Sequence, residues 1–213
     1  MLLPKRIVLI TATLLVLIGF FAGAQENPPD ESPFTPQIRT NQRSLGDQTF
    51  TISAGLYVPL FTVLLNDYGG YDAGAIKANL KPGGAGSLAY SFYLSPNWKL
   101  GLQFSGSFAK DINGNFAYTI PINVKGTYEF HPGNRITVPL HLGVGIAMSS
   151  WRENFIVDPI LRPGAGVYFD WNFEWSFGMD ISWWFIPQLT ADDKSENSIG
   201  NFMDITLSAE YHF

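Results

Sequence analysis

Hydrophobic and polar residues alternate along most of the chain beyond residue 48, with the period of two that is typical of β-strands. In the segment 201–213 the hydrophobic positions are Met203, Ile205, Leu207, Ala209, Tyr211 and Phe213. The residues between them are polar, namely Asp204, Thr206, Ser208, Glu210 and His212. This segment therefore predicts a strand with one hydrophobic face and one polar face.

The same alternation predicts eight strands, at 49–61, 86–94, 98–109, 116–130, 135–148, 160–170, 175–185 and 201–213. Short connections rich in Pro, Asn or Gly follow the second, fourth and sixth strands, at 95–97, 131–134 and 171–172. Longer polar connections follow the first, fifth and seventh, at 66–84, 149–158 and 190–200. Only the third, around 111–115, is shorter than this scheme expects. An even number of strands, with short periplasmic turns and longer external loops, is typical of bacterial outer-membrane barrels.

The polar face of the predicted strands carries nearly all of their charged side chains, whereas the opposite face is aliphatic or aromatic. An eight-stranded barrel has little room inside, so the bulky residues fit only on its outside. The sequence therefore predicts an all-β, eight-stranded, antiparallel up-and-down transmembrane β-barrel. The polar residues expected to line its lumen are Lys99, Gln103, Asn123, Lys125, Glu129, His141, Arg162, Asp170, Asp180, Asp204 and Glu210. Buried charges need partners, so we expect ion pairs to fill the lumen rather than a selective ion pathway.

The N-terminal residues have the features of an export signal. Lys5 and Arg6 precede an apolar run over 7–21, which is followed by Ala22-Gly23-Ala24. This pattern predicts a signal peptide over 1–24. The alternative is an uncleaved anchor helix. A spanning helix needs roughly 20 apolar residues, and the run over 7–21 is shorter than that. The Pro-rich segment 25–47 is predicted to be an irregular periplasmic leader, with a structured plug as the alternative, and the barrel spans 48–213.

Composition limits the other classes of function. The 213 residues contain 13 Lys and Arg against 18 Asp and Glu, for a formal net charge of −5. A nucleic-acid partner would require a basic patch, so none is expected. The chain contains no cysteine, which excludes disulfides, thiol catalysis and a cysteine-ligated zinc site. We expect no metal and no cofactor.

Aromatic residues recur near the predicted strand ends, as expected for the interface belts of a membrane barrel. One belt would contain Trp98, Tyr128, Phe130, Trp171, Trp175, Tyr211 and Phe213, and the other Phe61, Phe108, Phe116, Tyr118, Trp183 and Phe185. The final strand also resembles those of outer-membrane barrels, which commonly end in Phe. The resemblance implies that Tyr211 and Phe213 form a signal for the barrel-assembly machinery, and that outer-membrane lipid surrounds the barrel.

Three local stretches resemble the OmpW family of eight-stranded outer-membrane proteins and, more loosely, the OmpA and OmpX barrels. They are Ser87–Tyr93 with Trp98 following, Val138–Gly145, and Gly164–Gly166 through Trp175–Phe177. The resemblance implies a narrow channel or uptake route for small hydrophobic molecules, with sideways release into the bilayer. The short third connection departs from the pattern of that family. A non-transporting structural or surface-interaction barrel, acting through loops 66–84 and 190–200, is the alternative.

Two prolines within strands suggest where such a release could occur. Pro121 and Pro163 lie in the fourth and sixth strands, and counting from the turns places both near the level of Val144. Proline cannot donate a hydrogen bond to a β-ladder, so we hypothesise a lateral opening at these three residues. The alternative is a pair of β-bulges without an opening. Unbroken backbone pairing across the three strands would argue against the gate.

We expect no enzymatic activity. Acyl hydrolases on barrels need a His beside a Ser and a carboxylate, but the three histidines of this chain, His131, His141 and His212, are scattered. No His-x-Ser pairing appears on a strand near the outer leaflet, and His141 is interpreted as a satisfied lumen residue. Together with the predicted export signal and membrane barrel, the sequence predicts a protein in the outer membrane of a Gram-negative or other diderm bacterium. We expect it to be a monomer.

Overall fold

A computed structural model describes residues 43–67, 72–151, 154–188 and 197–213, all of which belong to one unit, Arg39–Phe213. The predicted signal peptide and most of the predicted leader lie outside these residues. Residues 43–47 form a turn that precedes the first strand. In the described part of the chain, no helix is long and apolar enough to cross a membrane.

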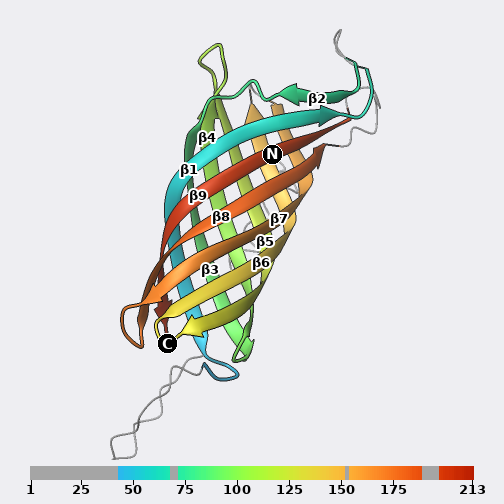
Figure 1. Cartoon of the computed structure of the whole chain (residues 1–213). Helices are drawn as coiled ribbons and strands as arrows, with labels where there is room; N and C mark the ends of the chain where they lie inside the picture. The colour runs from blue at the N-terminus through green and yellow to red at the C-terminus, as the bar shows by residue number, and fades with distance from the viewer. Residues whose placement is uncertain (1–42, 68–71, 152–153, 189–196) are drawn as a thin grey trace, which may run out of the picture. The chain divides into compact units, whose positions relative to one another are not determined.

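Nine antiparallel β-strands lie within the described ranges (Figure 1). They are β1 (Gln48–Leu64), β2 (Gly74–Lys77), β3 (Gly83–Ser95), β4 (Trp98–Lys110), β5 (Phe116–Gly133), β6 (Ile136–Trp151), β7 (Asn154–Asp170), β8 (Trp175–Gln188) and β9 (Ser198–His212). β1 pairs with β3 on one side and with β9 on the other, so β1 and β3–β9 form a closed ring of eight strands. The predicted fold class is confirmed.

The barrel has two ends that differ in their connections. Short turns at 96–97, 134–135 and 171–174 lie at one end, together with the start of β1 and the C-terminus, and we call this the termini end (Figure 1). The longer connections and β2 lie at the opposite end, which we call the loop end (Figure 1). Two connections at the loop end are short: a turn over 111–115 joins β4 to β5, and only residues 152–153 lie between β6 and β7. The prediction of a longer connection at 149–158 is therefore wrong, because both strands extend into it.

Two elements differ from the sequence prediction. β2, inside the predicted connection 66–84, pairs with the far part of β1, from Phe61 opposite Lys77 to Leu64 opposite Gly74. β7 begins at Asn154 instead of residue 160, because Phe155, Ile156 and Val157 are consecutive hydrophobic residues without a period of two. All three side chains are exposed, at 66%, 47% and 50%. The start of β7 therefore has exposed hydrophobic side chains on both of its faces.

The two faces of the wall have the predicted orientation. The bulky residues Phe92, Phe104, Phe169, Phe177, Trp183 and Phe185 point outward and are exposed. Inward positions carry mostly Ser, Thr, Gly and charged side chains, and those with side chains are largely buried. A soluble barrel would bury its large hydrophobic residues, whereas this barrel exposes a continuous hydrophobic outer surface. That arrangement matches barrels that are surrounded by lipid.

Candidate functional site

The lumen contains all eleven polar residues that the alternation assigns to it. Ten of them are buried, and Lys125 is half-buried. They come from β4 to β9, and closure of the ring brings side chains more than a hundred residues apart into contact. We take the lumen as the candidate functional site.

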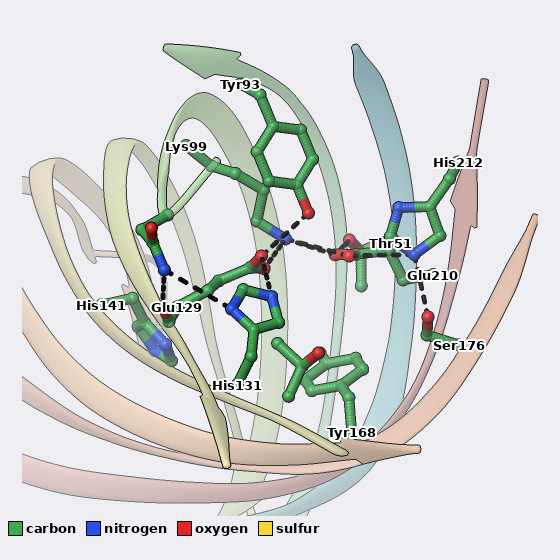
Figure 2. A network of polar contacts seen from close by, with 12 residues as sticks. Thr51, Tyr93, Lys99, Glu129, His131, His141, Tyr168, Ser176, Glu210 and His212 are labelled. Atoms are coloured by element: carbon green, nitrogen blue, oxygen red, sulfur yellow. Dashed lines mark hydrogen bonds and ion pairs between the residues drawn. The ribbon is translucent and has the colours of Figure 1, made fainter. Parts of the chain in front are cut away.

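Near the termini end, Lys99 on β4 lies between two glutamates (Figure 2). Its Nζ is 2.6 Å from Glu129 Oε1 on β5 and 2.9 Å from Glu210 Oε1 on β9. Tyr93 donates its hydroxyl to Glu129 over 2.9 Å, and Thr51 donates to Glu210 over 2.9 Å. We call these five residues the Lys99 cluster. Because its charges are buried and its carboxylates accept further hydrogen bonds, the cluster joins β1, β3, β4, β5 and β9 across the barrel.

A histidine lies beside each glutamate of the Lys99 cluster. His131 Nε2 is 3.8 Å from Glu129 Oε2, and His212 Nε2 is 3.5 Å from Glu210 Oε1. The latter ring nitrogen is also 2.9 Å from Ser176 Oγ (Figure 2). Ser176 Oγ donates a 2.6 Å hydrogen bond to Asp170. These contacts extend the polar packing to the termini end of the lumen.

Arg162 forms a second ion pair closer to the middle of the barrel. Its guanidinium donates to Asp204 on β9 and, over 2.5 Å, to Ser105 on β4. The guanidinium carbon also lies 4.8 Å from the centre of the Trp184 ring, within the range of a cation–π contact. Arg162 therefore marks the boundary between the polar and the hydrophobic parts of the lumen.

Lys125 does not form the ion pair that we predicted for it. Among the residues that the structure describes, no carboxylate is within ion-pair distance of its ammonium and no hydrogen bond holds it. The carboxylate of Asp180, which also lines both of the cavities that Lys125 reaches, accepts from the Tyr168 hydroxyl and from Ser208 instead. The prediction of an ion pair for Lys125 is wrong: the neutral donors both bind Asp180 Oδ2, and Asp180 Oδ1, although it has no hydrogen-bond partner in the described ranges, is not within ion-pair distance of Lys125.

The loop half of the lumen contains a hydrophobic cluster, although Ser107 and Asp158 are also buried there. Six buried residues, which we call the apolar cap, pack together there: Tyr57, Ala109, Ala147, Ile160, Trp184 and Ile186. Leu80, Ala85 and Phe202 pack against them. The Tyr57 ring lies 5.2 Å from the Trp184 ring and 5.3 Å from the Phe202 ring. The sequence did not identify the cap, because its members come from five strands.

The free space in the lumen is small and divided. A cavity of about 550 Å³ lies among the Lys99 cluster, His131, His212 and Asp170, but the centre of a water molecule fits in only about 20 Å³ of it. A second cavity, of about 270 Å³, lies between Arg162, His141 and Gln103, with about 10 Å³ for a water centre. Since one water needs roughly 10–15 Å³ by this measure, the first cavity has room for one or two waters and the second for about one. Lys125 lines both of them.

His141 has a serine neighbour that the sequence did not reveal. Its Nε2 lies 3.1 Å from Ser182 Oγ on β8, and its Nδ1 lies 4.0 Å from Asp180 Oδ1. A Cβ on Gly164 would lie 2.3 Å from Nε2 of this histidine, so glycine there makes room for the ring. The 4.0 Å separation is too long for a hydrogen bond, and Ser182 is buried beside a cavity of water size. We therefore interpret His141 as a packed lumen residue.

The backbone pairing argues against the lateral opening predicted between the strands of Pro121, Val144 and Pro163. At Val144 the ladders continue on both sides, opposite Val124 on β5 and opposite Leu161 on β7. Pro121 interrupts the β4–β5 ladder, in which pairing stops at Phe104–Ile122 and resumes at Ser107–Thr119. Pro163 interrupts the β7–β8 ladder, between Leu161–Phe185 and Gly164–Ser182. Pro139 interrupts the β6–β7 ladder in the same way, between Thr137–Tyr168 and Leu140–Ala165. Each proline lacks a backbone N–H that could donate to the neighbouring strand, so the wall is weakened at these three seams.

Aromatic rings outside the barrel form contacts along the termini end. Trp98 contacts Tyr128 at 5.0 Å between ring centres, and Tyr128 contacts Phe130 at 4.7 Å. Trp175 contacts Tyr211 at 5.0 Å, and Tyr211 contacts Phe213 at 5.8 Å. Ring pairs at this level match an aromatic girdle at a membrane interface. Within the described residues, no three His, Asp or Glu side chains gather in a way that would hold a metal ion.

Comparison with known proteins identifies two relatives and a shared fold. An uncharacterized protein of Borreliella burgdorferi is 27% identical over 183 residues, covering 76% of this chain and 81% of the relative. An uncharacterized protein of Treponema pallidum is 27% identical over 195 residues, covering 90% and 88%. The crystal structure of Neisserial surface protein A superimposes with a TM-score of 0.56 at 8% identity, covering 79% of this chain and 97% of that one.

This likeness shows a shared fold, the closed antiparallel barrel of outer-membrane proteins. A protein-family model also matches residues 28–211, which is more than half of the chain. The chain therefore belongs to the family that this model describes.

Proposed function

We propose that this protein lies in the outer membrane of a diderm bacterium and admits small hydrophobic molecules at its loop end, from which they leave sideways into the bilayer. The observation that carries the proposal is the hydrophobic cluster in the loop half of the lumen, next to buried ion pairs nearer the termini end. A hydrophobic solute is compatible with Tyr57, Trp184 and Ile186. It is not compatible with the buried ion pairs of Lys99 and Arg162 below them.

Passage along the barrel axis is disfavoured by the same ion pairs. A solute that crossed this layer would have to separate buried charges, and breaking one buried pair costs about 3–5 kcal/mol. Of the two cavities beside these ion pairs, the first has room for one or two waters and the second for about one. We therefore propose that the termini half is a closed floor rather than a pore for ions.

Sideways release is supported by the positions of the interrupted ladders. Pro121 pairs with Ala147, a member of the apolar cap, and its missing pairs face β4. Trp184 lies in the stretch of β8 that lacks pairs with β7 near Pro163. The seams at Pro121 and Pro163 therefore border the apolar cap. The resemblance to the OmpW family in Ser87–Tyr93 and Val138–Gly145 supports the same route, and the spirochete sources of the two relatives support the location.

Other parts of the proposal follow from the lumen and the final strand. We propose a monomer. We also propose that it has no enzymatic activity, because the cavities beside the lumen histidines leave space only of water size. We also propose that the barrel-assembly machinery inserts it, through Tyr211 and Phe213 at the end of β9.

The test is uptake of N-phenyl-1-naphthylamine, a small hydrophobic probe that fluoresces in lipid, by diderm cells that express the protein. Expression should raise the uptake rate several-fold over cells carrying an empty vector. The purified protein in a planar bilayer should show no large, steady conductance. An unchanged uptake rate, with the protein correctly folded in the outer membrane, would refute the uptake route.

A surface-interaction barrel without transport is the second candidate. It is favoured by the projecting start of β7, where Phe155, Ile156 and Val157 are all exposed. An exposed run of hydrophobic residues at a loop end is suited to contact with another surface. If this candidate is correct, the F155S/V157S variant should lose binding of host or envelope ligands, while the wild-type protein should show no uptake of the probe.

A further inference from the structure

The segment 74–82, which we call the strap, crosses the loop end beside the apolar cap (Figure 1). It begins as β2, which pairs with β1 from Phe61 to Leu64. β1 pairs with β3 only as far as Tyr57 opposite Gly83. Beyond that point β1 no longer pairs with β3, and from Phe61 it pairs with β2. The strap therefore lies between the loop end of β1 and the start of β3.

The far side of the strap is attached to the end of β4. Leu80 forms an isolated antiparallel bridge with Asp111, and the Lys81 N–H donates a 2.7 Å hydrogen bond to the Lys110 carbonyl. The Leu80 side chain also packs against the apolar cap. The strap therefore covers the same hydrophobic residues that the proposed uptake route uses.

Asp111 belongs to a short turn that holds its shape without the strap. Its carboxylate accepts hydrogen bonds from the Asn115 backbone N–H at 2.8 Å and from the Asn115 side chain at 2.9 Å. Its own N–H donates to the Asn115 carbonyl over 2.9 Å, and Gly114 has a φ of +90°, which favours glycine. Asp111 itself is only 2% exposed. The turn is therefore a rigid catch against which the strap can dock.

The two attachments of the strap differ in extent. β2 is held by a ladder of four residue pairs, from Phe61–Lys77 to Leu64–Gly74. The Leu80–Lys81 stretch is held to the catch by an isolated bridge, a far smaller contact than the ladders of the wall. Fluctuations open the least-bonded backbone contacts first. Release is therefore expected at the catch, between two fixed sides: β2 before it and β3, which is paired from Gly83, after it.

We propose that the strap is a latch over the apolar cap: Leu80 and Lys81 leave Lys110 and Asp111 to admit a hydrophobic molecule and then reattach. This inference rests on the proposed uptake function and adds the step that controls access. It also gives a role to the short connection between β4 and β5, which departs from the pattern expected for the OmpW resemblance.

A disulfide across the catch tests the latch, because the chain contains no cysteine of its own. Lys81 and Lys110 lie opposite each other next to the Leu80–Asp111 bridge, and both are exposed. Directly opposed strand residues have the separation that a disulfide requires. The K81C/K110C variant should take up N-phenyl-1-naphthylamine at least about tenfold more slowly when oxidised, and dithiothreitol should restore the rate.

Two controls separate the latch from other effects. The V63C/I199C variant links β1 to β9 at the same end without holding the strap, since Val63 pairs with Ile199, and its oxidation should leave uptake unchanged. The K81S/K110S variant removes both charges without a cross-link and should keep the uptake rate of the wild type. Equal loss in the oxidised control would overturn the latch.

Failure of the latch can be distinguished from failure of the uptake function. If wild-type protein takes up the probe and the cross-linked variant does so at the same rate, only the latch is wrong. If wild-type protein takes up no probe, the proposed function is wrong. Absence of disulfide formation would show that strap and turn are not neighbours, which also overturns the latch.

A second measurement needs no substitution. Amide hydrogen exchange of the detergent-solubilised protein should be at least about tenfold faster for the Lys81 N–H than for the amides of the β1–β9 ladder near Val63. Equal protection of the two would contradict release at the catch.

Discussion

Trp183 and Trp184 are adjacent in β8 but lie on opposite sides of the barrel wall. Trp183 is 41% exposed on the outer surface, and its Nε1 donates a 3.1 Å hydrogen bond to Asn201. Trp184 is 0% exposed inside the lumen, where it packs against Tyr57 and Arg162. One residue of displacement along a strand therefore separates the lipid-facing surface from the apolar cap.

This relationship predicts a difference in quenching by lipid. In variants that retain a single tryptophan, brominated acyl chains should quench the fluorescence of Trp183 strongly and that of Trp184 weakly, because the wall separates Trp184 from the bilayer. The measurement is tryptophan fluorescence in vesicles with and without brominated lipid. Equal quenching of the two, or a mature protein that is soluble as a monomer without detergent, would contradict the outward hydrophobic surface.

The Lys99 cluster predicts a large loss of stability on removal of its cation. K99M leaves Glu129 and Glu210 buried without their partner, so the free energy of unfolding should fall by roughly 3–5 kcal/mol. K125M is the matched control, since no ion pair holds Lys125 among the described residues, and it should cost clearly less. Urea unfolding in lipid, followed by tryptophan fluorescence, measures both. Equal losses would show that the cluster does not stabilise the barrel.

The interrupted ladders predict an effect of proline replacement on uptake. P121V and P163V restore a backbone N–H, so each should strengthen its seam by about 0.5–1.5 kcal/mol, the contribution of one hydrogen bond. Uptake of N-phenyl-1-naphthylamine should slow as a result. P139V is the control, because Pro139 interrupts the β6–β7 ladder in the termini half, away from the apolar cap. Slower uptake in all three variants would argue against release at the cap.

Two glycines predict opposite outcomes of the same substitution. A Cβ on Gly145 would lie 2.0 Å from the Ile122 carbonyl oxygen and 2.6 Å from the Asn123 Cα. A Cβ on Gly106 would have no heavy atom of the described residues within 4 Å beyond its chain neighbours. G145A should therefore cost about 1–3 kcal/mol through overpacking. G106A, which faces outward, should change the free energy of unfolding by less than about 0.5 kcal/mol. Chemical denaturation of the folded protein distinguishes them, and similar values would show that the wall at Gly145 relaxes freely.

The sequence predicted the strands well where the alternation of residues was regular. The predicted 98–109 and observed Trp98–Lys110 nearly coincide, because every second position is hydrophobic. The start of β7 and the whole of β2 were missed. In both places the chain is exposed or covers an end of the barrel, so the wall does not impose a period of two. The pairing of β2 with β1 depends on contacts between residues that are apart in the chain, and the alternation of neighbouring residues carries no information about such contacts.

The sequence by itself determined which residues face the lumen and which face outward, because in a strand the period of two assigns each side chain to a face. It also supplied the excess of bulky groups on one face, which a narrow interior cannot hold. Only the tertiary structure decided which lumen residues meet. Ring closure and strand register leave Lys125 without an ion pair to any residue in the described ranges. They also place Lys99 beside Glu210 and gather the apolar cap from five strands. These contacts join residues far apart in the chain, and their geometry follows from the closure of the barrel.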